Sequence, residues 1–361
     1  MLKKLAVIFF VLHYIPAFAQ APFAQVSQTP LLVNPSLAGS KAKQRISAAV
    51  NTYGSAKEKY ANGFVSYDGT LKKLGSGFGV YYSYNAFSQD TAQSAERQLY
   101  KSSSKFGSSS QRHTVGVAIA PKYSVYSKAE PNKIIYSFSP SLGLEYGHLS
   151  LAKDYNYQTY TGTVYDTSYV GGHNYLDYAS YYLSTLSANT FRISMGFQLN
   201  SDNTLVQYRA SYGVELVHEK EGITSTNSSL QSPTTKSYNY SLYYIDQSLN
   251  AGRTFAIGQG NFAITCLGGI GYKHYLSPLA SNQIYDVNFI GGKATTINYK
   301  HLSVTGKIYR LLLGLAYTQS FLNTYSGITI GYQSDNIKIT STWNVLTKGS
   351  LFSEITASYL F

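Results

Sequence analysis

The chain has 361 residues, and its 29 Lys or Arg against 17 Asp or Glu give a formal net charge of +12. Tyrosine supplies 36 residues and charged residues only 13% of the chain, which excludes intrinsic disorder. The sequence has none of the long apolar runs, about 18 residues or more, that a helical membrane protein needs. The one cysteine, Cys266, excludes an intramolecular disulfide framework and a multi-cysteine zinc site, and we expect it to be a small buried hydrophobic residue within a strand.

The first segment has the features of an export signal. Lys3 and Lys4 are followed by a mostly apolar stretch over residues 5–15, and Ala17-Phe18-Ala19 supplies small residues for a signal peptidase. We predict a signal peptide over residues 1–19, cleaved after Ala19. The cleavage point has no cysteine, so a lipid anchor is not expected there.

Beyond the signal, apolar and polar residues alternate with period two. In residues 190–201 the apolar positions are odd and the polar positions even, and residues 204–218 repeat the alternation after a short Ser201–Asn203 turn. Successive strand residues face opposite sides of a sheet, so each such strand has one apolar and one polar surface. The apolar residues of the first strand are Phe191, Ile193, Met195, Phe197 and Leu199.

This alternation predicts an all-β fold, a transmembrane antiparallel β-barrel of about 14 strands over residues 45–361. Strands of about ten residues span the hydrocarbon layer when tilted, and closure satisfies every backbone group in lipid. A secreted β-sandwich or propeller is the soluble alternative. The expected strands lie near residues 45–53, 61–68, 76–87, 112–124, 134–148, 190–201, 204–218, 237–250, 261–275, 294–304, 308–321, 326–333, 336–345 and 351–361.

The connections agree with an even number of strands, which leaves both termini in the periplasm. Long polar connections are expected on the outer side and short turns on the periplasmic side. The last strand, 351–361, ends in Tyr359 and Phe361, which we interpret as the barrel-assembly signal of an outer-membrane protein. The long connections are 88–111, 149–189, 219–236 and 276–293, and the short turns are 201–203, 305–307 and 334–335.

An extended N-terminal segment, residues 20–44, precedes the barrel. Pro30 and Pro35 each remove a backbone donor and push the preceding residue toward extended conformations, so we expect neither a helix nor a central strand there. Gly39 permits a positive φ, and Asn34 can bond to the local backbone. One interpretation is a structural lead-in that packs across the barrel opening; the other is a plug that docks a partner.

Residues 23–40 resemble the N-terminal signature of the PorP/SprF family of type IX secretion and gliding-motility proteins, approximately F-S-Q-Y-M-x-N-P-L-x-x-N-P-A-Y-A-G-S. The resemblance implies a barrel that helps to export or anchor large surface proteins, often adhesins, and contacts periplasmic lipoproteins of the machine. It makes Phe23, Gln25, Pro30, Asn34, Pro35 and Gly39 candidate partner-binding residues. The residues that agree with the signature are Phe23, Gln25, Pro30, Leu31, Asn34, Pro35, Ala38, Gly39 and Ser40.

Residues for catalysis or metal binding do not cluster in the sequence. The histidines after residue 100 are scattered without ligand spacing, and the Gly-Gly pairs lack a following Lys-Ser/Thr, which argues against phosphate binding. We therefore expect no enzyme, no cofactor and no metal. A Ser-His pair on facing loops, as in an outer-membrane phospholipase or protease, is the alternative that spacing alone does not detect.

Two further groups of residues have two interpretations each. The inward charges Arg45, Lys122, Arg192, Arg209 and Lys338 share a face with Glu145, Glu215 and Glu354, and either line a selective pore or brace a filled barrel through salt bridges. The tyrosines of residues 155–182 either form a binding surface or belong to an interfacial girdle. The candidate partner-binding tyrosines are Tyr155, Tyr157, Tyr160, Tyr165, Tyr169 and Tyr175.

These observations predict a non-enzymatic outer-membrane barrel of the type IX secretion or gliding machinery. Its outer loops would hold the C-terminal domain of a secreted, adhesin-like surface protein, and its periplasmic side would contact secretion-machine lipoproteins. Outer-membrane lipid is a further partner, and nucleic acid is not expected. The alternative is a diffusion porin or small-molecule outer-membrane transporter.

Overall fold

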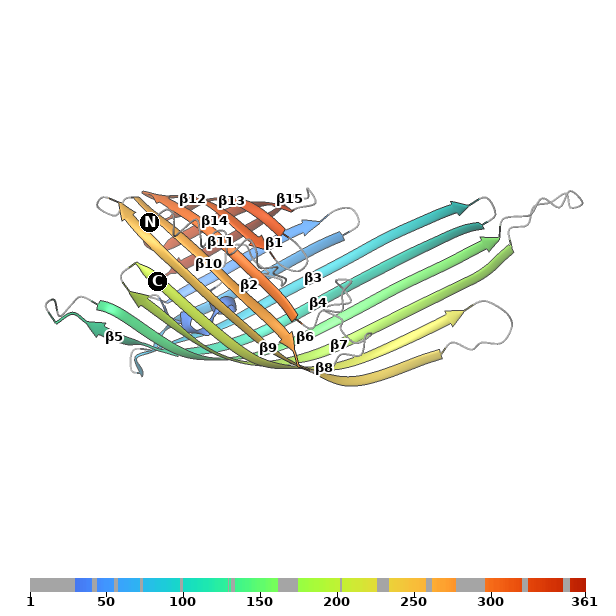
Figure 1. Ribbon diagram of the computed structural model, residues 1–361, viewed down its shortest axis with the longest axis horizontal. Coiled ribbons are helices and arrows are strands. Elements are labelled where there is room, and N and C mark those ends of the chain that lie inside the picture. Colours follow the sequence, from blue (N-terminus) through green and yellow to red (C-terminus); the bar gives the residue numbers. More distant parts are fainter. Residues whose placement is uncertain are drawn as a thin grey trace, which may run out of the picture.

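Figure 1 shows a computed structural model of the chain. The predicted signal peptide, residues 1–19, and residues 20–29 of the N-terminal segment lie outside the described residues. The structure describes residues 30–40, 44–54, 58–71, 74–97, 100–128, 130, 134–161, 175–201, 203–225, 234–257, 262–276, 296–319, 324–346 and 351–361.

The chain forms an all-β, closed, 14-stranded antiparallel barrel, as the alternation predicts. β4 and β5 flank Lys122 and both pair with β6, so together they make one strand position of the barrel. The strands are β1 Arg45–Gly54, β2 Glu58–Leu71, β3 Ser76–Arg97, β4 Tyr100–Pro121, β5 Tyr123–Tyr126, β6 Ile134–Thr161, β7 Tyr175–Ser201, β8 Thr204–Ser225, β9 Thr234–Ile257, β10 Phe262–Tyr275, β11 Thr296–Ile308, β12 Leu311–Gln319, β13 Thr324–Gln333, β14 Ile337–Leu346 and β15 Leu351–Leu360.

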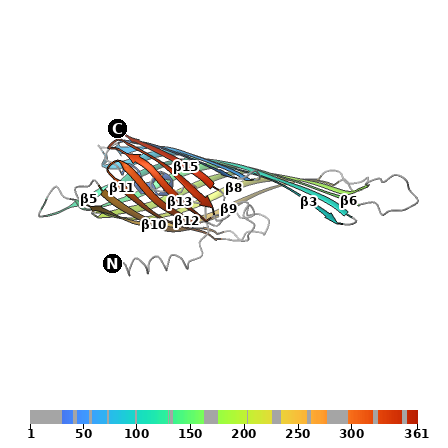
Figure 2. The same ribbon diagram turned by 90° about the horizontal axis from the view of Figure 1, so that it is seen from above.

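The first and last strands close the barrel. β1 pairs with β2 on one side and with β15 on the other, with Arg45 opposite Leu360. Closure leaves no free edge within the membrane, where an unpaired backbone group would find no water. Figure 2 places the C-terminus at the end of the barrel away from the projecting strands. We call that end the turn end and the opposite end the loop end.

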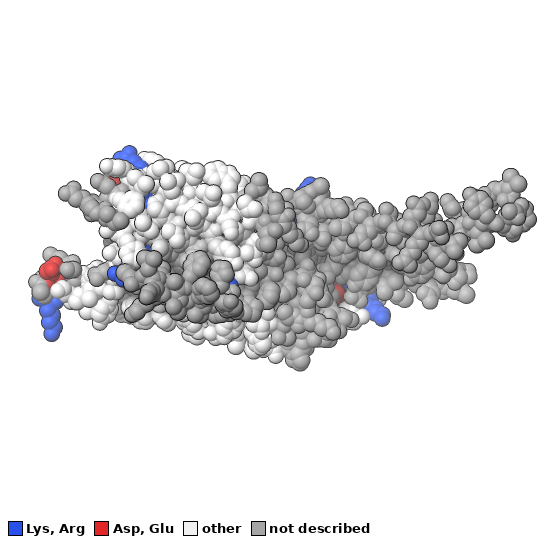
Figure 3. Space-filling view, turned by 45° about the horizontal axis from the view of Figure 1, so that its top comes forward, with Lys and Arg blue, Asp and Glu red and all other residues white. Residues whose placement is uncertain are grey.

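The outer surface of the barrel is apolar, and its inner surface is polar. Leu315 and Met195 each expose 64% of their surface on the outside, whereas Thr342 and Glu354 are fully buried on the inside. The wall seen in Figure 3 is a belt nearly free of charged residues over the described part. Inside, threonines bridge neighbouring strands, with Thr329 Oγ1 2.9 Å from Thr342 Oγ1. This distribution fits lipid outside and a packed polar interior.

Six neighbouring strands continue past the barrel wall at the loop end. β3, β4 and β6 to β9 have 22 to 28 residues each, against 9 to 14 in the other long strands, and they project as one sheet (Figure 1). The long connections predicted at 88–111, 149–189 and 219–236 are therefore wrong over most of their length. These stretches are rich in Ser, Lys and Tyr, so the apolar and polar alternation that marks a membrane strand is lost over most of them.

The predicted turns are confirmed at two of three places. β7 and β8 are joined across residues 202–203, and β13 and β14 across residues 334–336. The turn expected at 305–307 is wrong: β11 continues to Ile308, and the chain reverses at Tyr309 and Arg310. Tyr309 has a φ of 54°, a backbone conformation that two-residue hairpin turns use and that glycine adopts more readily. Gly306, which suggested the earlier turn, instead pairs with Leu313.

Two smaller observations complete the fold. Cys266 lies in β10 as predicted, but it is only half-buried, on the same face as the exposed Ile270. Cys266 thus lies on the outer face of β10, which is directed toward lipid, and a small apolar residue is compatible with that face without being fully buried. Within the described ranges, no helix is long and apolar enough to cross a membrane.

The outer surface can be tested at Leu315. We expect Leu315→Arg to lower the free energy of unfolding by about 2–4 kcal/mol, because a cation near the middle of the hydrocarbon layer loses its hydration. Urea unfolding in lipid vesicles, followed by tryptophan fluorescence, measures the change. Leu315→Phe is the control and should unfold near the wild-type urea concentration. If the Arg variant were as stable as the Phe variant, the outer surface at Leu315 would not be in contact with lipid.

Candidate functional site

A short segment inside the barrel, residues 30–40, is called the plug here. It contains α2, Pro30–Val33, and the 3-10 turn η2, Pro35–Leu37. The prediction that this segment contains no helix is wrong for Pro30–Val33, because proline is tolerated in the first helical turn, where the N–H has no partner within the helix. α2 ends before Asn34, the residue that precedes Pro35, as the restriction on such residues requires.

Hydrogen bonds tie the middle of the plug to β8 of the wall. Asn34 caps η2 by accepting from the Ser36 N–H at 3.0 Å, and its Nδ2 donates to the Tyr208 carbonyl at 3.0 Å. Arg209 Nη1 donates to the Leu32 carbonyl at 3.1 Å. The two bonds to Tyr208 and Arg209 join residues more than 170 positions apart in the sequence. The plug is therefore a fixed part of the barrel interior.

At its C-terminal end the plug is held by Asp68 of β2. The Gly39 N–H donates to Asp68 Oδ1 at 3.0 Å, while Arg45 Nε donates to Asp68 Oδ2 at 2.8 Å. Asp68 is fully buried, so both of its oxygens need such partners. Gly39 has a φ of 56°, and a β carbon there would lie 2.3 Å from the Gly69 carbonyl oxygen. Only glycine fits this position.

Four inward glycines of the wall form the seat of the plug. Because these glycines have no side chain, a plug residue can approach the wall backbone closely at each of them. A side chain at any of these positions would crowd the plug residue. The plug also contributes Leu31 and Ala38 to a buried apolar cluster with residues of β1 to β4. A β carbon would lie 1.9 Å from Ala38 O if added at Gly77, 2.6 Å from Leu31 Cδ1 at Gly79, 3.1 Å from Pro35 Cβ at Gly143 and 2.4 Å from Asn34 Oδ1 at Gly196.

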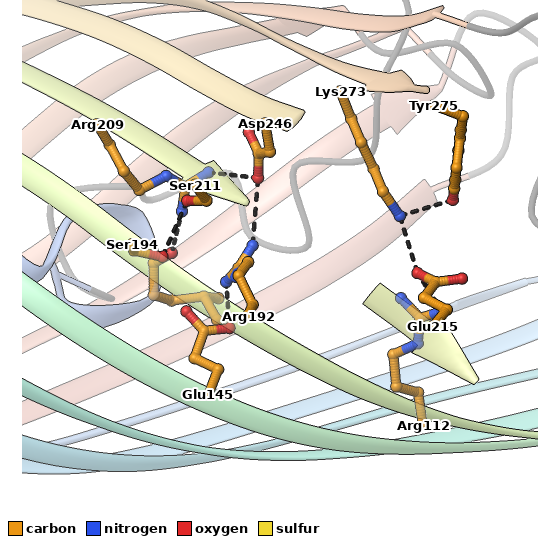
Figure 4. A network of polar contacts seen from close by, with 11 residues as sticks. Arg112, Glu145, Arg192, Ser194, Arg209, Ser211, Glu215, Asp246, Lys273 and Tyr275 are labelled. Carbon is orange, nitrogen blue, oxygen red and sulfur yellow. Dashed lines mark hydrogen bonds and ion pairs between the residues drawn. The ribbon is translucent and has the colours of Figure 1, made fainter. Parts of the chain in front are cut away.

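A charged cluster lies beside the plug (Figure 4). Arg192 bridges Glu145 and Asp246, with 3.2 Å to the latter, and Arg209 reaches the same Asp246 oxygen at 2.8 Å. These residues come from four consecutive strands, β6 to β9. Because Arg209 also binds Leu32, the cluster and the plug form one connected network.

A second group of ion pairs lies nearer the loop end. Lys273 Nζ is 3.0 Å from Glu215 Oε1 and donates to the Tyr275 hydroxyl at 2.6 Å, and its charge lies 4.0 Å from the centre of the Tyr244 ring. Arg112 approaches Glu215 at 3.9 Å. Both Glu215 and Asp246 are largely buried and paired, which favours the interpretation that inward charges brace a filled barrel.

The predicted partner-binding residues fall in different places. Asn34, Pro35 and Gly39 are buried inside the barrel, and Pro30 begins α2, while Phe23 and Gln25 lie outside the described residues. Tyr155, Tyr157 and Tyr160 lie in the projecting part of β6, Tyr175 begins β7, and Tyr165 and Tyr169 lie outside the described residues. Partner binding by these residues stays a prediction.

The sequence interpretation missed Asp68, which holds the plug, and Asp246, which pairs with Arg192 and Arg209 beside it. Each is a single carboxylate within an otherwise neutral stretch, so the charge pattern alone gave no reason to select it. The seat glycines had a detectable signal, since they occupy inward positions of strands that otherwise carry side chains there. Within the described residues, no group of three or more His, Cys, Asp or Glu is placed to hold a metal ion.

Comparison with known proteins supports the fold alone. No protein-family model and no curated protein matches the chain. A FadL homologue from Pseudomonas aeruginosa matches with a TM-score of 0.50 at 10% identity, over 96% of this chain and 99% of that one. A mutant of the TodX monoaromatic hydrocarbon channel matches with a TM-score of 0.48 at 13% identity, over 92% and 94% of the two chains. The fold is thus that of outer-membrane barrels.

The charged cluster can be tested at Asp246. We expect Asp246→Ala to lower the free energy of unfolding by about 3 kcal/mol, because it leaves Arg192 and Arg209 buried with fewer anionic partners. Asp335→Ala is the matched control, since Asp335 is exposed in a turn and should change stability by no more than about 0.5 kcal/mol. Urea unfolding in vesicles measures both. Equal stabilities of the two variants would contradict the bracing role.

The seat can be tested at Gly77. We expect Gly77→Ala to displace the plug, because the new methyl group would overlap the Ala38 carbonyl. A cysteine at Ser36, which is 1% exposed, reports on displacement through faster labelling by a water-soluble maleimide in a Cys266→Ser background. Gly63→Ala is the control, because a β carbon at Gly63 meets nothing within 4 Å. Equal labelling rates in the two variants would show that the plug does not depend on this seat.

Proposed function

We propose that the protein is a non-enzymatic outer-membrane barrel of the type IX secretion or gliding machinery, which binds a secreted surface protein and helps to export or anchor it. The observation that carries the proposal is the plug, in which the residues that resemble the PorP/SprF signature are seated on wall glycines. Pro35 faces Gly143 and Asn34 faces Gly196. The residues that resemble the signature thus help to fill this barrel.

A filled interior argues for a role carried out at the surfaces. The plug, the cluster around Asp246 and the ion pairs of Glu215 occupy the inner side of strands β2 to β10. Paired and buried charges hold their positions more firmly than solvated ones, which disfavours a wide path for solutes. A barrel of this kind acts through what it binds at its two ends.

The projecting sheet offers such a surface at the loop end. It carries Tyr155, Tyr157 and Tyr160 on β6, and tyrosine gives a large contact area for little loss of side-chain entropy. In the proposed mechanism the sheet and the outer loops hold the C-terminal domain of the adhesin-like cargo. The turn end faces the periplasm and contacts lipoproteins of the secretion machine.

One observation favours a second candidate, a porin or small-molecule transporter. Asn250, His301 and Thr318 on β9, β11 and β12 are buried, and side-chain polar atoms of all three have no hydrogen-bond partner among the described residues. Buried polar groups of this kind are usually satisfied by water. A water-filled path along the inner side of β9 to β12 would allow small solutes to pass.

An affinity pull-down from native outer membranes separates the two candidates. A tag inserted between β8 and β9, within residues 226–233, leaves the strands intact. We expect a large secreted protein to be recovered together with periplasmic lipoproteins, because the proposed role requires both contacts. The purified barrel should not conduct ions in a planar bilayer. A barrel recovered without partners that conducts would support the transporter, and the same tag on an unrelated outer-membrane barrel is the control.

A further inference from the structure

Two histidines of neighbouring strands lie opposite each other on the outer face of the sheet. His113 of β4 is the direct partner of His148 of β6 in the antiparallel ladder, and both side chains are exposed. Residues directly opposite each other in such a ladder have their β carbons about 4.5–5.5 Å apart. The two imidazoles are therefore close neighbours, although the two residues lie far apart in the sequence and their spacing does not indicate a ligand pair.

The pair lies where the apolar belt of the barrel gives way to the projecting sheet. Toward the turn end, the next outward residues of the two strands are Val115 and Tyr146, which are paired and exposed. Toward the loop end, the next outward residues are the polar pair Gln111 and Ser150. Tyrosine is typical of the boundary between lipid and water. Dissolved ions can therefore reach both rings.

The ring of His148 is held by a neighbour on β7. Its Nδ1 lies 2.9 Å from Asn189 Oδ1, and the Tyr146 hydroxyl donates to the same oxygen at 3.0 Å. An amide oxygen only accepts hydrogen bonds, so Nδ1 of His148 carries the hydrogen and Nε2 keeps its lone pair. Histidines that bind metals are commonly fixed in this way, through a hydrogen bond from the ring nitrogen that does not bind the metal.

The ring of His113 is held in the same manner from the other side. Its Nδ1 lies 2.8 Å from the hydroxyl of Tyr82 on β3, which can accept a hydrogen bond. The four strands lie in the order β3, β4, β6 and β7, so each histidine is bonded to the strand on its far side. The two nitrogens lie on opposite sides of an imidazole ring. Holding both Nδ1 atoms at the far strands thus directs both Nε2 atoms toward the gap between β4 and β6.

The free lone pairs favour a cation over an anion. An anion would need both rings to be protonated, which places two positive charges side by side. A metal cation instead uses the lone pairs that the hydrogen bonds leave available. Within the described part of the chain, the hydrogen bonds of His113 and His148 are made through Nδ1 and not through Nε2.

We propose that His113 and His148 form a binding site for a transition-metal cation such as Zn²⁺, which the Nε2 atoms of the two rings ligate. Imidazole nitrogen is a preferred ligand of zinc, copper and nickel ions. No third His, Cys, Asp or Glu among the described residues joins the pair, so water completes the coordination. The bound ion joins β4 to β6 at the point where the projecting sheet leaves the barrel.

His218 provides a matched control within the same sheet. Its Nδ1 lies 2.6 Å from Asn239 Oδ1, so its ring is held by the same kind of bond as that of His148. The residues directly opposite His218 are Ser187 and Asn239, neither of which is a histidine. His218 thus presents one imidazole in the same setting but without a second one beside it.

Titration of Zn²⁺ into the purified barrel, in detergent and without a polyhistidine tag, tests the site against a zinc-sensitive dye. We expect half-saturation at about 10–100 µM, as for a site with half the ligands of a structural zinc site. His113→Ala and His148→Ala should each weaken binding at least about tenfold, because one imidazole remains. Asn189→Ala removes the acceptor that orients His148 and should weaken binding by about tenfold. His218→Ala should bind zinc as the wild type does.

Chemical modification locates the bound ion independently of affinity. Diethylpyrocarbonate modifies accessible imidazoles, and mass spectrometry of peptides identifies them. Saturating Zn²⁺ should protect His113 and His148 and leave the modification of His218 unchanged. Heat-modifiable migration on gels verifies that each variant forms a barrel.

Three results would each overturn the proposal. The first is zinc binding by His113→Ala or His148→Ala as tight as in the wild type. The second is a loss in His218→Ala as large as that in His148→Ala. The third is equal modification of His113 and His148 with and without zinc.

Discussion

The pairing of β1 with β15 is the contact on which the rest of the structure depends. Without it a sheet of this size would present two unpaired edges to lipid, where no water is available to satisfy them. Closure also determines which side of every strand faces inward, because a shift of one residue would exchange the apolar and polar faces. The polar interior, the plug and the charged cluster are consequences of that one register.

The interior of the barrel imposes a second requirement, because it must be filled without leaving buried charges unpaired. The wall supplies bare backbone at glycines such as Gly77 and Gly196, and the plug supplies the groups that fit there. Arg209 connects the plug to the charged cluster, since it binds both the Leu32 carbonyl and Asp246. Removing one of these groups would leave others without partners, so plug and wall are best regarded as a single packed unit.

The sequence predicts the membrane part of the fold well and the rest poorly, for a physical reason. Residues 190–201 alternate because one side meets lipid and the other the interior, and the strand is found there. Residues 88–97 belong to β3, yet their sequence, SQDTAQSAER, has no alternating apolar residues to mark a strand. Pro30, Asn34 and Pro35 mark the plug in the sequence, but its partners Asp68 and Arg209 lie far away along the chain, and no local pattern indicates such contacts.

The projecting sheet is continuous with the barrel wall, and this continuity has a mechanical consequence. A load attached to β6 or β7 outside the cell pulls along strands that run uninterrupted into the membrane. Ladder hydrogen bonds lie perpendicular to the strands, so such a pull loads many of them in shear at once. A sheet loaded in shear resists far more force than one unzipped bond by bond, and the barrel can thus transmit traction to the outer membrane without a hinge.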